Sequence, residues 1–165
     1  MTIMEWNDTL AVDGGVMDDT HKEFVELLNK LGEVEGDAVL PAIDEFIAHT
    51  EEHFLQEQRW MQEIPFPPIH CHVNEHNGVL DICREVRTRV ANGETRYSKV
   101  LAQAIGEWFE THASSMDTVL AMVMKEQGYA ATRGAGDVAV KQPVLEAAGG
   151  CGCSGGGAGA GGCGS

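Results

Sequence analysis

The chain has 165 residues and a formal net charge of -15, which suits one domain and a tail and disfavours nucleic-acid partners, because phosphate contacts require lysine and arginine. It has no run of about 18 apolar residues, so we expect no membrane-spanning helix. The first residues, MTIMEWNDTL, lack the basic and apolar regions of a secretory signal, and we expect a cytoplasmic protein that contacts neither nucleic acid nor membrane.

Apolar residues recur every three or four positions along most of the chain, which is the helical period. After an irregular arm over residues 1–17, this pattern predicts four helices. They span Asp18–Glu33, Val39–Glu63, Ile69–Ala91 and Thr95–Gln127. Helices of this length joined by short connections favour an up-down-up-down four-helix bundle. We therefore predict an all-α fold that consists of an N-terminal arm, this bundle and a flexible C-terminal tail.

The helical pattern fails after the fourth helix. We place the bundle in residues 1–129 and a disordered tail rich in glycine and cysteine in residues 130–165. Half of the 20 glycines of the chain fall within Gly149–Ser165. Such a segment has too few apolar side chains to form a core of its own.

The five cysteines divide between the third helix and the tail. The odd number argues against a disulfide framework, and Cys71 and Cys83 are expected to be unreactive helical residues. The tail cysteines are Cys151, Cys153 and Cys163. Two interpretations remain open for them: a soft-metal or redox-thiol site, or cysteines without a role in a disordered segment.

Histidines and carboxylates gather in one layer of the predicted bundle. With a rise of about 1.5 Å per residue, positions at equal distances before and after a connection lie at similar heights in antiparallel helices. The pairs that match in this way are His21 with His53, Glu57 with His72, and His76 with His112. Independent core histidines would not be expected to align across all four helices.

Spacing along each helix also favours a metal site. His53 and Glu57 are four residues apart, as are His72 and His76, so each pair shares a helix face. His112 and Asp117 are five residues apart, about 140° around an α-helix, and are expected to flank one seam rather than to share a face. The candidate metal ligands are therefore His21, His53, Glu57, His72, His76, His112 and Asp117. They are too many for one tetrahedral zinc ion and suit two ions bridged by the carboxylates.

This arrangement resembles the hemerythrin family in its bacterial form. The residues that carry the resemblance are His21, HFLQE at 53–57, HVNEH at 72–76 and HASSMD at 112–117, together with Trp6 and Met61. The resemblance covers residues 1–127 and implies a non-haem centre of two iron ions. It implies that His72, His76 and His112 bind one iron and that His21 and His53 bind the other. Glu57, Asp117 and an oxo or hydroxo group would bridge the two ions.

The implied function is reversible O2 binding at an open position of the second iron, for carriage, storage or scavenging. Two alternatives share the fold: a di-iron redox enzyme, such as a peroxidase or nitric oxide reductase, and an oxygen or iron sensor. The chain lacks the paired Glu-x-x-His motifs of carboxylate-rich di-iron proteins, so we expect a binding protein rather than an enzyme.

We also make predictions for three residues outside the candidate ligand set. Phe109 stands where leucine is frequent beside the oxygen pocket of the family, and its larger ring is expected to narrow the pocket or change autoxidation. His49 and His70 are expected to lie outside the metal site, on the surface or beside the ligands.

Overall fold

The computed structural model describes residues 2–12 and 15–134, and every regular element within these ranges is helical. The α-helices are α1 (Val16–Glu33), α2 (Val39–Glu63), α3 (Ile69–Ala91), α4 (Tyr97–His112) and α5 (Thr118–Glu126). A short 3-10 helix (Gly36–Ala38) precedes α2, and a π-helical turn (Ala113–Asp117) joins α4 to α5. The first three predicted helices therefore agree with the structure to within two residues at each end.

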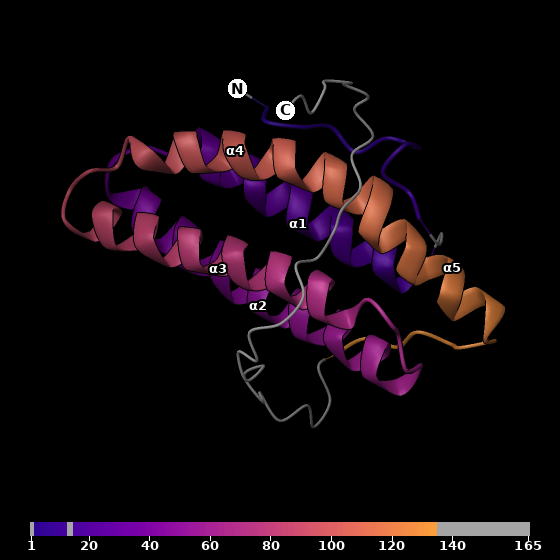
Figure 1. Ribbon diagram of the computed structural model, residues 1–165. Coiled ribbons are helices and arrows are strands. Elements are labelled where there is room, and N and C mark those ends of the chain that lie inside the picture. The colour runs from indigo at the N-terminus through magenta and orange to yellow at the C-terminus, as the bar shows by residue number, and fades with distance from the viewer. Residues whose placement is uncertain (1, 13–14, 135–165) are drawn as a thin grey trace, which may run out of the picture.

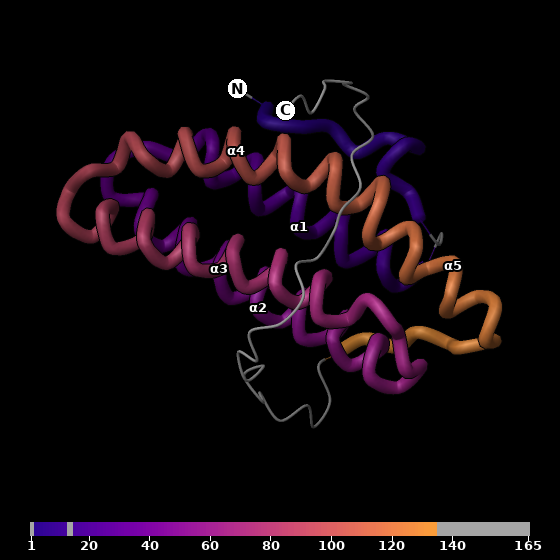
Figure 2. The backbone as a smooth tube through the Cα atoms, viewed as in Figure 1, coloured from indigo at the N-terminus to yellow at the C-terminus, as the bar shows by residue number. Residues whose placement is uncertain are grey.

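The four long helices run alternately up and down and lie side by side (Figure 1). α1 packs against α2 and α4, and α3 packs against the same two helices, so each helix has two neighbours. Figure 2 follows the chain through the tight reversals at the two ends of the bundle. The predicted all-α, up-down-up-down bundle is confirmed. Among the described residues, no helix is long and apolar enough to cross a membrane.

Glycine and proline residues end two of the helices sharply. Gly93 ends α3 with a φ of 93°, a left-handed conformation that glycine adopts without a steric penalty. Three prolines follow α2 within Pro65–Pro68, and proline cannot continue a helix because it lacks a backbone N–H. Short, sharply ended connections hold the helices in register, which is what aligns side chains at one height.

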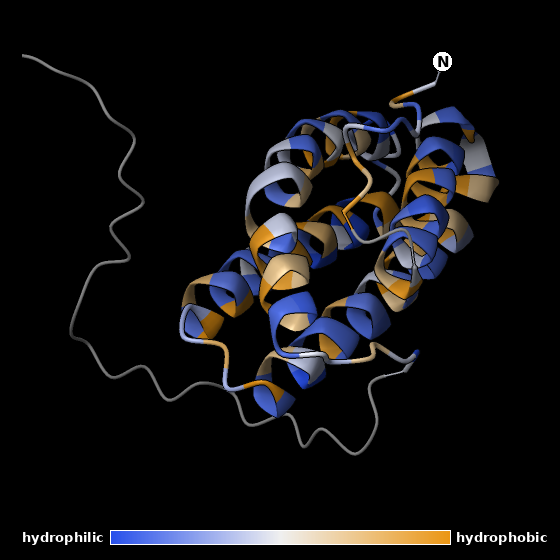
Figure 3. Cartoon of the chain, turned by 90° about the vertical axis from the view of Figure 1, so that its right-hand side faces the viewer, coloured by the Kyte–Doolittle hydropathy of each residue, from blue (hydrophilic) through white to orange (hydrophobic). Residues whose placement is uncertain are grey.

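Each helix is amphipathic, and Figure 3 shows hydrophilic and hydrophobic residues alternating along all of them. The buried side chains form two apolar clusters. One contains Phe24, Phe46, Phe54 and Phe109, and the other contains Met17, Trp60, Met61 and Leu120. His21, Glu57, His76 and Asp117 each lie in the sequence between residues of one cluster and residues of the other. Apolar packing therefore excludes water on both sides of their layer.

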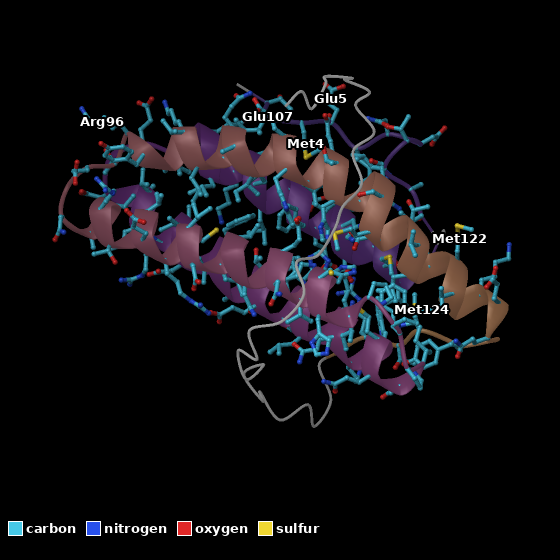
Figure 4. All side chains as sticks on the ribbon, in the orientation of Figure 1. Met4, Glu5, Arg96, Glu107, Met122 and Met124 are labelled. Atoms are coloured by element: carbon cyan, nitrogen blue, oxygen red, sulfur yellow. The ribbon has the colours of Figure 1, made fainter. Side chains whose placement is uncertain are left out.

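The N-terminal arm packs onto α1. The side-chain oxygen of Asn29 accepts hydrogen bonds from the backbone N–H groups of Ile3 and Met4, at 2.7 and 3.1 Å, and its amide donates to the carbonyl of Met4 at 2.8 Å. Ile3 lies so close to Gly32 that a Cβ there would be 2.6 Å from it. In Figure 4, Met4 lies nearer the bundle than Glu5, in agreement with their burial and exposure.

The fourth helix differs from its prediction. Instead of one α-helix over Thr95–Gln127, α4 starts at Tyr97, the π-helical turn interrupts the α-helical pattern, and α5 ends at Glu126. Hydrophobic periodicity did not reveal the interruption, because the π-helical turn is short and apolar residues recur at helical spacing on both sides of it.

The chain after α5 returns along the bundle as far as residue 134. Thr132 accepts a hydrogen bond from the Trp60 indole at 3.0 Å, Arg133 pairs with Glu23 at 2.6 Å, and the backbone of Gly134 donates to Gln56 at 2.9 Å. Contacts with α1 and α2 thus continue five residues beyond the predicted boundary at 129. The rest of the predicted tail, with its three cysteines, lies outside the described residues.

The two cysteines of α3 differ from each other. Cys83 is a free, buried thiol, and burial raises its pKa to about 12, as expected for an unreactive core residue. Cys71 is disulfide-bonded, so the prediction that it is an unreactive thiol is wrong.

Candidate metal centre

Four helices and one turn contribute the seven predicted ligands, and all seven are buried. They are His21 on α1, His53 and Glu57 on α2, His72 and His76 on α3, His112 on α4 and Asp117 at the end of the π-helical turn. No predicted site residue is displaced from this layer. The structure therefore brings together every residue that sequence spacing selected.

The π-helical turn is what brings His112 and Asp117 together. Since a π-helical turn connects residue i with residue i+5, the two side chains come to one face, and His112 Nε2 lies 3.3 Å from Asp117 Oδ1. Nearby hydroxyls donate to backbone carbonyls: Ser114 to Glu110 at 2.7 Å, Ser115 to Thr111 at 2.5 Å and Thr118 to Ala113 at 2.9 Å. Such local bonds offer the backbone an alternative to the regular α-helical pattern. The expectation that His112 and Asp117 do not share a face is therefore wrong.

The ligand atoms fall into two overlapping groups. One group contains His72, His76, His112, Glu57 and Asp117, and the other contains His21, His53 and Glu57. Within each group, the candidate ligand atoms all lie within 4.8 Å of one another. One position thus has three imidazoles and the other has two, with Glu57 common to both.

Glu57 directs one oxygen to each group. Its Oε1 lies 2.9 Å from His53 Nε2 and 3.4 Å from His21 Nε2. Its Oε2 lies 3.3 Å from His72 Nε2 and 3.4 Å from His76 Nε2. A carboxylate placed in this way can contact an ion on each side.

Asp117 is arranged in the same manner. Its Oδ2 lies 3.4 Å from His21 Nε2, whereas its Oδ1 lies 3.1 Å from His72 Nε2 and 3.3 Å from His112 Nε2. Both oxygens of Asp117, and Oε2 of Glu57, are buried without a hydrogen bond of suitable geometry. Buried anionic oxygens without such bonds are costly unless cations lie beside them.

The imidazole nitrogens also suit a cation. His112 Nε2 lies 3.0 Å from His76 Nε2 and 3.2 Å from His72 Nε2, so three ring nitrogens converge on one point. Two nitrogens bound at about 2.1 Å and at right angles to each other would lie about 3.0 Å apart. Their spacing therefore fits ligands around one metal ion.

The electrostatics of the metal-free cluster follow from this geometry. Burial alone would lower the pKa of His72, but the carboxylates of Asp117 and Glu57 raise it to about 9. Burial dominates at His76, whose pKa falls well below its ordinary value. Burial would raise the pKa of the two carboxyl groups, yet the imidazoles around them hold the pKa of both below the ordinary range. Protonated histidine thus balances the carboxylates where a metal cation would otherwise do so.

The metal-free protein is expected to lose stability as the pH rises from 6.5 to about 9, the ordinary and folded pKa values of His72. Since the folded pKa is the higher one, the stabilisation by protonated His72 is complete below pH 6.5 and is lost as the pH rises through the folded value. Thermal melts of chelator-treated protein across this range measure the effect. A His72→Gln variant should lack this loss, and a constant melting temperature in the parent chain would contradict the prediction.

The other histidines lie where the sequence placed them. His49 is partly buried and pairs with Glu23 at 3.2 Å, with its ring 6.1 Å from the ring of His53. His70 is exposed. Glu75 approaches His112 from outside the cluster and was not among the residues predicted from the sequence. The glutamate within HVNEH was the available signal, but its spacing gives no indication of a contact with another helix.

The fold and the cluster define a class of protein: a four-helix bundle with a buried metal-binding site of histidines and carboxylates. The family model described as the hemerythrin HHE cation binding domain matches residues 15–123. The chain belongs to the hemerythrin family.

Similar proteins agree with this assignment. A bacteriohemerythrin of Ralstonia nicotianae is 38% identical over 128 residues, which cover 78% of this chain and 93% of the relative. A bacteriohemerythrin of Stenotrophomonas maltophilia is 29% identical, covering 76% of this chain and 84% of the relative. A crystal structure of a hemerythrin mutant matches with a TM-score of 0.67 and 22% identity, covering 75% of this chain and 98% of that one, which supports the fold. The family and the cluster together fit O2 binding at a di-iron centre.

Proposed function

We propose that this chain binds O2 reversibly at a non-haem centre of two iron ions. In the iron-loaded protein, His72, His76 and His112 would hold one iron, His21 and His53 would hold the other, and Glu57 and Asp117 would contact both. An oxo or hydroxo group would complete the bridge. When bound, two ferrous ions supply the two electrons that O2 binding requires.

The observation that carries the proposal is the pair of carboxylates between two unequal histidine groups. Each carboxylate has one oxygen toward His21 and the other toward His72. With both carboxylates shared, the ion beside His21 has one protein ligand fewer than its neighbour. That difference leaves one position for a small ligand.

The surroundings of this position are apolar. The ring of Phe109 meets the ring of His21 edge-on, with centroids 5.1 Å apart, and Phe24 lies 5.8 Å from the ring of His53. Both phenylalanines are buried. An apolar wall excludes water and favours a small neutral ligand such as O2 over ions.

Binding is favoured over redox catalysis and sensing. The relatives are named as hemerythrins rather than as peroxidases or reductases. A role in oxygen transport rather than storage, and a cytoplasmic location, stay predictions from the sequence.

An anaerobic titration tests the function. The iron-loaded protein is reduced, exposed to O2 and then deoxygenated, while the visible spectrum is recorded. An O2-dependent absorption band that appears and then disappears on deoxygenation is the expected result. Irreversible oxidation with turnover of peroxide or nitric oxide would support the enzyme instead, and an iron-loaded protein without any response to O2 would overturn the proposal.

Phe109→Leu is expected to accelerate autoxidation severalfold. Loss of the ring opens space beside His21 through which water can approach, at a stability cost of about 1 kcal/mol. The decay rate of the O2-dependent band measures the change.

Phe46→Leu is the matched control for this variant. Phe46 is fully buried in the same apolar cluster and contacts Phe24, with ring centroids 5.1 Å apart. The control therefore creates a similar cavity without opening space at His21. Equal autoxidation rates in the two variants would contradict the role of Phe109.

A further inference from the structure

Glu75 lies at the outer edge of the histidine cluster, on the exposed side of α3. Its Oε2 accepts a hydrogen bond from the Trp108 indole N–H at 3.0 Å. The same oxygen lies 3.7 Å from His112 Nδ1. Trp108 also stacks on His112, with ring centroids 4.4 Å apart. The indole therefore holds the carboxylate beside the imidazole on which its own ring rests.

The two ring nitrogens of His112 face in different directions. Its Nε2 faces the cluster, whereas its Nδ1 is buried and has no hydrogen-bond partner. When Nε2 binds a metal, the ring proton must be on Nδ1, which then becomes a donor. Histidine ligands of metals usually donate this proton to a carboxylate, a carbonyl or water, which fixes the ring and makes it a stronger ligand.

We propose that Glu75 is a positioning residue that accepts the Nδ1 proton of His112 in the metal-loaded protein. The inference rests on the proposed ligation of a metal by His112. The present separation of 3.7 Å is about half an ångström beyond a normal hydrogen bond, and a small rotation of the half-exposed side chain closes it.

The local surroundings strengthen such a bond. Glu75, Trp108 and His112 line a groove of about 600 Å³, together with apolar side chains such as Phe66, Met116 and Val119. A charge-assisted hydrogen bond in such partly apolar surroundings is screened less than one in open water.

The hydrogen bond with Glu75 would strengthen metal binding on one side of the centre, the side of His112. The Nδ1 atoms of His21, His53 and His72 are also buried without a hydrogen-bond partner. Among the described residues, the carboxylate that pairs with a ligand histidine through Nδ1 is that of Glu75 with His112. Glu75 therefore makes the ion with three histidines the more strongly held of the two. The less strongly held ion is then the one with the open position.

Zinc binding to the metal-free protein tests the inference without O2 chemistry. Competition with a chromophoric chelator gives the affinity, and NMR of histidine-labelled zinc protein reports the Nδ1 proton of His112. Glu75→Gln should weaken the tighter zinc site about tenfold and shift that proton resonance upfield. Trp108→Phe keeps the stacked ring but loses the indole N–H. This variant should also weaken zinc binding and shift the proton resonance upfield, but by less than Glu75→Gln does.

Glu107→Gln is the matched control. Glu107 lies on α4, five residues before His112, and its exposed side chain points away from the bundle (Figure 4). Glu107→Gln removes the same charge as Glu75→Gln. An equal loss of zinc affinity in both variants, or an unshifted His112 Nδ1 proton resonance in Glu75→Gln, would overturn the inference. Failure of the parent chain to bind two zinc ions would instead count against the metal site itself.

Discussion

Glu57→Gln is expected to reduce the metal content from two ions per chain to one or none. Glu57 is the residue common to both histidine groups, and each of its oxygens faces one group. The amide has the same shape but no charge, and its nitrogen is not a ligand, so one ion loses a bond and both lose a balancing charge. Metal analysis of protein reconstituted with ferrous iron measures the result.

The control for this variant is Glu52→Gln. Glu52 lies on the same helix and is exposed, so its replacement removes one charge without touching the cluster. This variant should retain two ions and the O2-dependent band. Two tightly bound ions in Glu57→Gln would contradict the bridging role.

His53→Ala is expected to remove the ion on the side of the open position and to abolish O2 binding. Only two histidines serve this side, and His53 lies 2.9 Å from the shared carboxylate. The other side keeps three histidines, so about one ion per chain should remain. Iron analysis and the O2 titration measure the two effects separately.

His49→Ala provides a matched comparison on the same helix. His49 lies one turn before His53 but directs its Nε2 to Glu23, outside the cluster. Its replacement should leave the metal content and the O2-dependent band unchanged. Equal losses in the two variants would indicate that His53 acts through packing rather than as a ligand.

The sequence predicted the site where spacing within one helix defines a face. His53 with Glu57 and His72 with His76 are such pairs, and short connections then aligned them across the bundle. His112 and Asp117 are different, because their approach depends on a π-helical turn that hydrophobic periodicity does not reveal.

Contacts between segments far apart in the chain could not be predicted from the sequence either. Nothing in the spacing of HVNEH indicates that Glu75 meets Trp108 of another helix. Likewise, polar composition placed Arg133 in a tail, although its pairing with Glu23 holds it against α1. Such contacts depend on how the helices and the returning chain pack together, and one sequence shows only which residues are available.

We propose that one buried layer of this bundle holds two iron ions between unequal sets of histidines. Anomalous diffraction at the iron edge from crystals of the iron-loaded protein tests it most directly. Two peaks are expected, one on each side of the carboxylates of Glu57 and Asp117. One should lie beside His72, His76 and His112 and the other beside His21 and His53. A single peak in this layer, or iron bound elsewhere on the chain, would contradict it.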